Sequence, residues 1–208
     1  MERADPVRDE MTDLADRLSE LHASQWDAAS LCAGWRIRDV LAHVVAGAEG
    51  AFGARAVVGG MLRHGLNFNR WVAADGRVRG EEDPADILAA LRNAANRRQT
   101  PARAPSVNGL MHVVVHGQDM CRPLGITRDL PAAHVVPVAN VVAADRHRFG
   151  ATKRIAGLKL RATDMEWSHG RGPEVAGPGE ALVMVMAGRL SALDDLSGEG
   201  KPILLTRG

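Results

Sequence analysis

The chain has 208 residues, of which 46% are hydrophobic and 25% charged, as in ordinary globular proteins. The formal net charge of +1 offers no electrostatic basis for binding nucleic acid, and no stretch is apolar enough to span a bilayer. The N-terminus has no apolar signal core, and Cys32 and Cys121 match no paired-cysteine motif. We therefore expect a protein of the reducing cytoplasm that binds neither nucleic acid nor membrane.

The first 150 residues carry the apolar spacing of amphipathic helices. Helices are predicted over residues 6–22, 36–48, 84–98, 106–122 and 131–146. Residues 24–34 are predicted to be a loop, and 50–65 either continue the second helix or form a short one. Residues 67–74 are also expected to be helical, with a break over 76–80 because of its glycines. This pattern predicts one domain, residues 1–150, built as an antiparallel four-helix bundle with extra helices.

The pattern changes after residue 150. Residues 157–164 alternate between apolar and polar, which predicts a strand, and 174–176 follow a turn at 167–172 as a return strand. A helix is predicted from Pro178 to Arg189, and residues 201–206 are expected to form a last strand. The tail, residues 151–208, is therefore predicted to be a small β-β-α-β unit packed on the bundle. The expected fold class is α+β and mainly α.

Three histidines form the candidate site. His112 and His116 are four residues apart, so a helix places them one turn apart on the same face, together with Asp119. That face contains no Lys, Arg or Glu. A third histidine from another helix, His43, would complete a half-open metal site.

Other interpretations of these residues remain open. The His112–His116 face could be solvated, and His43 alone is typical of a hydrogen-bonded core histidine. Asp39, four residues before His43, could orient a metal-bound imidazole or form a surface pair. Asp119 could orient His116 or cap the helix.

Further candidates lie away from the histidines. Asn69 and Arg70 could bind a cofactor's carboxylate or hydroxyls, or simply be solvated. Arg189 could bind an anionic substrate or stabilise a helix C-terminus. Cys32 has no neighbouring base in the sequence and is expected to be a small buried residue. Trp35 and Trp167 are expected in the core and His169 in solvent.

Residues 32–43, CAGWRIRDVLAH, closely resemble the N-terminal motif of the mycothiol-dependent maleylpyruvate isomerase family, within the DinB-like superfamily of helical bundles. Residues 115–125, VHGQDMCRPLG, resemble the family's second metal-ligand helix, and the tail resembles short actinobacterial members. The resemblance implies a divalent metal held by His43, His112 and His116. The ligand set of the isomerase itself resembles His/Glu/His. This chain has His112 at the position of that carboxylate. Neutral His112 leaves the site one unit more positive, which should lower a bound thiol's pKa further.

The resemblance implies a metal-dependent enzyme that activates a low-molecular-weight thiol, mycothiol, for S-transfer to, or isomerisation of, a small electrophile. Zinc is the first choice of metal, with nickel, iron and manganese as alternatives. The competing interpretations are a non-catalytic metal- or ligand-binding stress-response module and a metal-free helical protein. A monomer and a homodimer are both compatible with the sequence.

Overall fold

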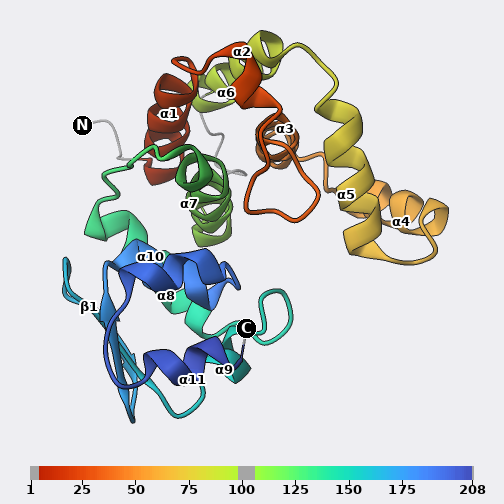
Figure 1. The fold of residues 1–208 in the computed structure, drawn as a ribbon. Coiled ribbons are helices and arrows are strands. Elements are labelled where there is room, and N and C mark those ends of the chain that lie inside the picture. Colours follow the sequence, from red (N-terminus) through yellow and green to blue (C-terminus); the bar gives the residue numbers. More distant parts are fainter. Residues whose placement is uncertain (1–4, 98–105, 208) are drawn as a thin grey trace. The chain divides into compact units, whose positions relative to one another are not determined.

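The computed structural model describes residues 5–97 and 106–207. The chain divides into two compact units, residues 1–128 and 129–208 (Figure 1). The first unit is helical. Its helices are α1 (Pro6–Leu18), α2 (Ala23–Trp26), α3 (Ile37–Ala48), α4 (Ala54–Arg63), α5 (Phe68–Arg79), α6 (Pro84–Asn96), α7 (Val107–Cys121) and the 3-10 turn η2 (Arg122–Leu124).

Four helices form the bundle of this unit. α1 and α3 each pack against both α6 and α7, so the four helices enclose a common core. The apolar spacing explains the packing, because the core face of α3 contains Ile37, Val40 and Val44, all completely buried. Polar side chains cap the helix starts: Asp5 accepts from the first turn of α1, and Ser106 from that of α7.

The region between the second and third predicted bundle helices differs from expectation. α4 is a separate helix, and α5 continues to Arg79, so the predicted break over 76–80 is wrong. Gly76 lies inside α5 against Trp35, where a Cβ would approach the indole Cζ2 to 2.9 Å. Gly76 therefore allows α5 to pack closely against Trp35. The short α2 also occupies part of the predicted loop.

A buried ion cluster joins the start of the first unit to its end. The Arg128 guanidinium pairs with Glu10 and with Asp13, whose Oδ2 lies 3.1 Å from Nε, and the Arg128 side chain is fully buried. Arg17 adds a hydrogen bond to the Thr127 carbonyl at 2.6 Å. These contacts hold the segment after α7 against α1.

The second unit combines helices with a small sheet. Its elements are α8 (Ala132–Ala143), α9 (Ala151–Arg154), β1 (Lys159–Ala162), β2 (Ser168–Gly170), β3 (Glu174–Gly177), α10 (Gly179–Met186), the 3-10 turn η3 (Leu190–Asp195) and α11 (Lys201–Leu205). The sheet order is β2-β1-β3, with β2 antiparallel and β3 parallel to β1. α10 packs against β1, β3 and α8, and its residues from Ala181 to Met186 are all buried.

The predicted β-β-α-β order of this tail is wrong in two places. β2 lies in the predicted turn, so the described strands all precede α10. Residues 201–205 form α11 where a strand was expected, with Pro202 in its first turn. Periodicity alone does not distinguish a strand from a helix in so short an apolar run.

The boundary between the units also differs from the expected one at residue 150. α8, predicted as part of the bundle domain, belongs to the second unit, because it packs against α10 and α9. The predicted fold class, α+β and mainly α, is confirmed. Within residues 5–97 and 106–207, we find no helix with the length and apolar character needed to cross a membrane.

The Arg128 cluster yields a stability prediction. Arg128→Met leaves the buried carboxylate of Glu10 without this partner, so the free energy of unfolding should fall by about 3–5 kcal/mol in urea titrations. The double variant Glu10→Leu with Arg128→Met should recover most of that loss, since both buried charges are removed. A single variant as stable as the wild type would contradict this role.

Candidate metal centre

His43 comes from α3, the helix that packs directly against α7. Its side chain is nearly buried, with 8% of the residue exposed. The rings of Trp35 and Phe52 each have centroids 5.1 Å from that of His43. Two aromatic rings therefore pack against the imidazole of His43.

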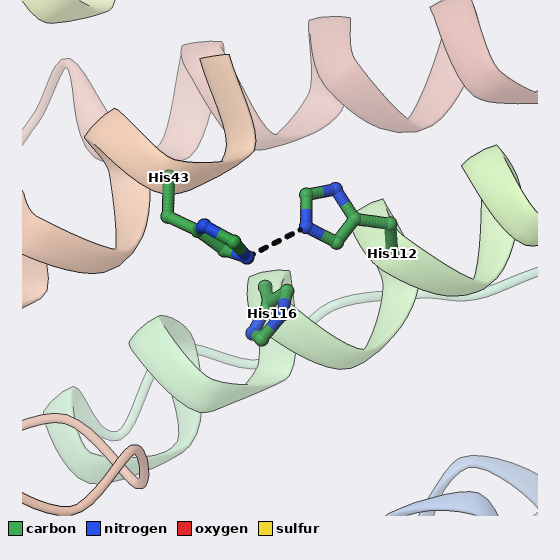
Figure 2. A group of neighbouring side chains, drawn as sticks. All are labelled: His43, His112 and His116. Carbon is green, nitrogen blue, oxygen red and sulfur yellow. Dashed lines mark hydrogen bonds between the residues drawn. The ribbon is translucent and has the colours of Figure 1, made fainter. Parts of the chain in front are cut away.

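His112 and His116 project from successive turns of α7. Both are half-buried, and the residues around them on this helix, including Val113 and Val115, are buried. In Figure 2 the two side chains extend from α7 toward His43, which reaches them from α3. The alternative of a solvated face does not describe this helix.

The structure brings the three imidazoles together. Nε2 of His43 lies 3.0 Å from Nε2 of His112, the contact drawn dashed in Figure 2. The ring centroids are 4.8 Å apart for His43–His112, 5.1 Å for His43–His116 and 4.8 Å for His112–His116. One nitrogen from each residue falls within 4.8 Å of the other two. Residues separated by about seventy positions in the chain thus converge on one point.

Burial, together with a smaller effect of the nearby charge of His116, lowers the pKa of His43 to about 3. The ring therefore stays neutral at physiological pH. Its Nδ1 is buried and has no hydrogen-bond partner among the residues that the structure describes. A neutral imidazole keeps one nitrogen lone pair, which is the form in which histidine binds metals.

Gly47 makes the approach of His112 possible. It lies on α3, one turn after His43, and a Cβ there would come within 2.6 Å of Cε1 and 3.0 Å of Nδ1 of His112. Only a residue without a side chain fits at that distance. Gly47 therefore allows α3 and α7 to approach closely enough for His43 and His112 to contact each other.

His116 is held on its other side by Asp119. Nδ1 of His116 and Oδ2 of Asp119 are 2.9 Å apart, and the carboxylate is completely buried. Asp119 precedes the helix end at Cys121 and accepts from an imidazole, so the capping alternative does not describe it. An imidazole that donates from Nδ1 carries its lone pair on Nε2.

Asp39 does not reach His43. Its two carboxylate oxygens accept from the Arg36 guanidinium at 3.2 and 2.9 Å, and Oδ2 also accepts from the Arg36 backbone at 2.9 Å. The expectation that Asp39 could orient His43 is therefore wrong. Arg36 lies at the N-cap of α3, so a carboxylate three residues later binds it across the first turn.

Other sequence-predicted residues lie outside the histidine cluster. Asn69 and Arg70 are exposed on α5, which packs against α3. Arg189 belongs to the second unit, where Nη1 donates to the Ala187 carbonyl at 2.7 Å and the guanidinium lies 5.8 Å from the centre of the Phe149 ring. Those contacts give Arg189 a structural use.

Cys32 has neighbours in the structure that the sequence did not predict. It is half-buried, and its Sγ lies 3.1 Å from Oδ2 of Asp119 and 3.7 Å from Nδ1 of His116. The expectation of a buried cysteine without a neighbouring base is therefore wrong. Because the partners are more than eighty residues away, no local signal could have revealed them.

The two tryptophans and His169 lie where the sequence predicted them. Trp35 and Trp167 are buried, and His169 is exposed on β2. Cys121 is completely buried, and burial raises the pKa of its thiol to about 11. That thiol stays protonated and belongs to the core.

The glycine contact yields a first prediction for this site. Gly47→Ala should push the His112 ring away from His43 and weaken divalent-metal binding, measured by cobalt titration of metal-free protein. Gly59→Ala is the matched control, because a Cβ at that helical glycine meets nothing closer than 3.7 Å. Equal cobalt affinities in the two variants would contradict the tight contact.

A second prediction concerns pH and the metal-free protein. The folded pKa of His43, about 3, lies below the ordinary value of 6.5, so the unfolded chain takes up the proton first as pH falls. The free energy of unfolding should therefore decrease below pH 6.5, by up to about 1.4 kcal/mol per pH unit from this residue. Urea titrations between pH 8 and 5 measure it. His43→Gln should show a shallower dependence; an unchanged slope would contradict the assignment.

Comparisons with known proteins agree with this architecture. The family model described as mycothiol maleylpyruvate isomerase N-terminal domain matches residues 7–121, more than half of the chain. Among solved structures, the mycothiol-dependent maleylpyruvate isomerase shares the fold with a TM-score of 0.58 at 16% identity, over 94% of this chain and 91% of that one. A histidine-to-alanine mutant of that isomerase gives a TM-score of 0.57 with the same identity and coverage. A comparison with curated proteins finds no match. The matched residues include the bundle and the three histidines, and the chain belongs to the mycothiol maleylpyruvate isomerase N-terminal domain family.

Proposed function

We propose that this protein is a metal-dependent enzyme that activates a low-molecular-weight thiol, mycothiol, for S-transfer to, or isomerisation of, a small electrophile. The observation that carries the proposal is the convergence of His43, His112 and His116 from two helices. Membership of the family supports mycothiol as the thiol.

The donor set fits a divalent cation. Two imidazole nitrogens bound tetrahedrally at zinc are about 3.3 Å apart, and the Nε2 atoms of His43 and His112 are separated by 3.0 Å. Three neutral nitrogen ligands suit zinc first, with nickel, iron and manganese as outcomes that metal analysis would distinguish. When bound, such a cation lowers the pKa of a thiol and polarises a substrate oxygen.

The protein's own residues prepare this site. Burial keeps His43 neutral, and Asp119 fixes the orientation of His116. In metal-free protein one Nε2 of the His43–His112 pair must donate to the other; binding a cation through both requires that proton to leave Nε2. A shift of this proton to Nδ1 of the same ring keeps that ring neutral and frees the Nε2 lone pair.

Candidate contacts to the thiol and the electrophile come from three polar side chains outside the histidine cluster. Exposed Asn69 and Arg70 lie on α5, which packs on the helix of His43, and are candidates for binding the carboxylate or hydroxyls of the thiol. Arg189 is the candidate for an anionic electrophile. Their substitution should raise KM more than it lowers kcat.

His116→Ala is the test of this function. Protein purified without a histidine tag should contain stoichiometric metal, and the variant should lose metal affinity by more than the roughly 10–100-fold typical of outer-shell changes. Turnover of a small electrophile with mycothiol should be lost with it, and also on treatment with a chelator. His147→Ala, at an exposed loop histidine, is the matched control.

Each outcome has a distinct meaning. Tight metal binding without turnover of any electrophile would favour a non-catalytic binding module. No stoichiometric metal after reconstitution would leave a metal-free helical protein. Metal occupancy that survives His116→Ala would contradict the ligand assignment.

A further inference from the structure

The segment before α3 is attached to α7 next to the histidines. The Leu31 backbone N–H donates to the Asp119 carbonyl at 3.0 Å. Within the segment, Ser30 Oγ accepts from the Cys32 backbone N–H at 3.1 Å and donates to the Trp35 carbonyl at 2.9 Å. These bonds hold Cys32 at a defined position against Asp119.

The Cys32 thiol and the His116 ring share one acceptor. Sγ of Cys32 lies 3.1 Å and Nδ1 of His116 lies 2.9 Å from the same atom, Oδ2 of Asp119. The Asp119 carboxylate has no solvent exposure, and a buried carboxylate is costly unless donors surround it. An S–H donor helps to fix the carboxylate that in turn fixes the imidazole.

We propose that Cys32 is a positioning residue for the histidine cluster, acting through Asp119 on His116. Its thiol donates to Oδ2 and holds the carboxylate where it accepts from Nδ1 of His116. The ring then has its proton on Nδ1 and its lone pair on Nε2, ready for a cation. This inference rests on the proposed function in naming the cation, but the fixed tautomer of His116 is a property of the metal-free protein.

A role for Cys32 as a metal ligand is the competing explanation, and the geometry is less favourable to it. The thiol lies within 4.8 Å of the ligand atoms of His116 and Asp119. Among the described residues, no group of ligand atoms that all lie within 4.8 Å of one another contains Cys32 together with His43 and His112. Its neighbour on His116 is Nδ1, the nitrogen already paired with Asp119.

Three substitutions at one position separate these roles. Cys32→Ser keeps a donor, whereas Cys32→Ala and Cys32→Val remove it, and valine roughly retains the volume. Two measurements are made on each protein: zinc affinity by competition with a chelator, and the ¹⁵N NMR shifts of the His116 ring without metal. Thermal unfolding of the metal-free variants shows the purely structural effect.

We expect the wild-type His116 ring to show a single tautomer with the proton on Nδ1. Cys32→Val and Cys32→Ala should mix the tautomers and weaken zinc binding by about 10-fold or more, as loss of an outer-shell partner does. Cys32→Ser should have both the single His116 tautomer and the zinc affinity of the wild type, even if its thermal stability equals that of the valine variant.

Other results would overturn the inference. Unchanged His116 shifts and zinc affinity in Cys32→Val would remove Cys32 from the positioning role. A sulfur-to-cobalt charge-transfer band in cobalt-substituted wild type, lost in Cys32→Ser, would make the thiol a ligand. If the wild type binds no metal but Cys32→Val still mixes the tautomers, the proposed function fails and the positioning role stands.

Discussion

The close contact between α3 and α7 is the constraint on which the candidate site depends. Three histidines can meet only if the backbones approach closely enough for imidazoles from both helices to share one space. Gly47 provides that approach, since a Cβ there would collide with the His112 ring at 2.6 Å. The apolar residues around the site are buried, so the close packing of the bundle core determines the geometry of the site.

Two buried carboxylates of the first unit, those of Asp39 and Asp119, have different kinds of hydrogen-bond partner. Asp39 is satisfied locally by Arg36 and contributes to the start of α3. Asp119 accepts from the imidazole of His116, three residues earlier on the same helix, and from the thiol of Cys32, which comes from a distant part of the chain. Only the second arrangement links a buried carboxylate to the histidine cluster, and it accounts for a charged residue without solvent exposure inside an apolar helix.

The division of the chain bears on how the proposed activity is organised. The three histidines, Asp119 and Cys32 all lie in the first unit, within the residues that the family model matches. All the proposed metal ligands therefore come from this one unit. Arg189 belongs to the second unit.

Local chemistry in the sequence was enough to predict most helices of the first unit. The apolar spacing of α1 and α3 depends on neighbouring residues, so it is readable along the chain. The i, i+4 spacing of His112 and His116 likewise determined that they share a face. The sequence also predicted that His43 would join them, through a motif.

Tertiary structure decided what depends on residues distant in the chain. Gly76 looks like a helix breaker in isolation, yet packing against Trp35 makes it part of α5. Residues 201–205 are too short for periodicity to separate strand from helix, so the surrounding unit determined the outcome. α8 joined the second unit because its apolar face packs on α10. Cys32 reached Asp119 across more than eighty residues, and only the folded chain defines such a contact.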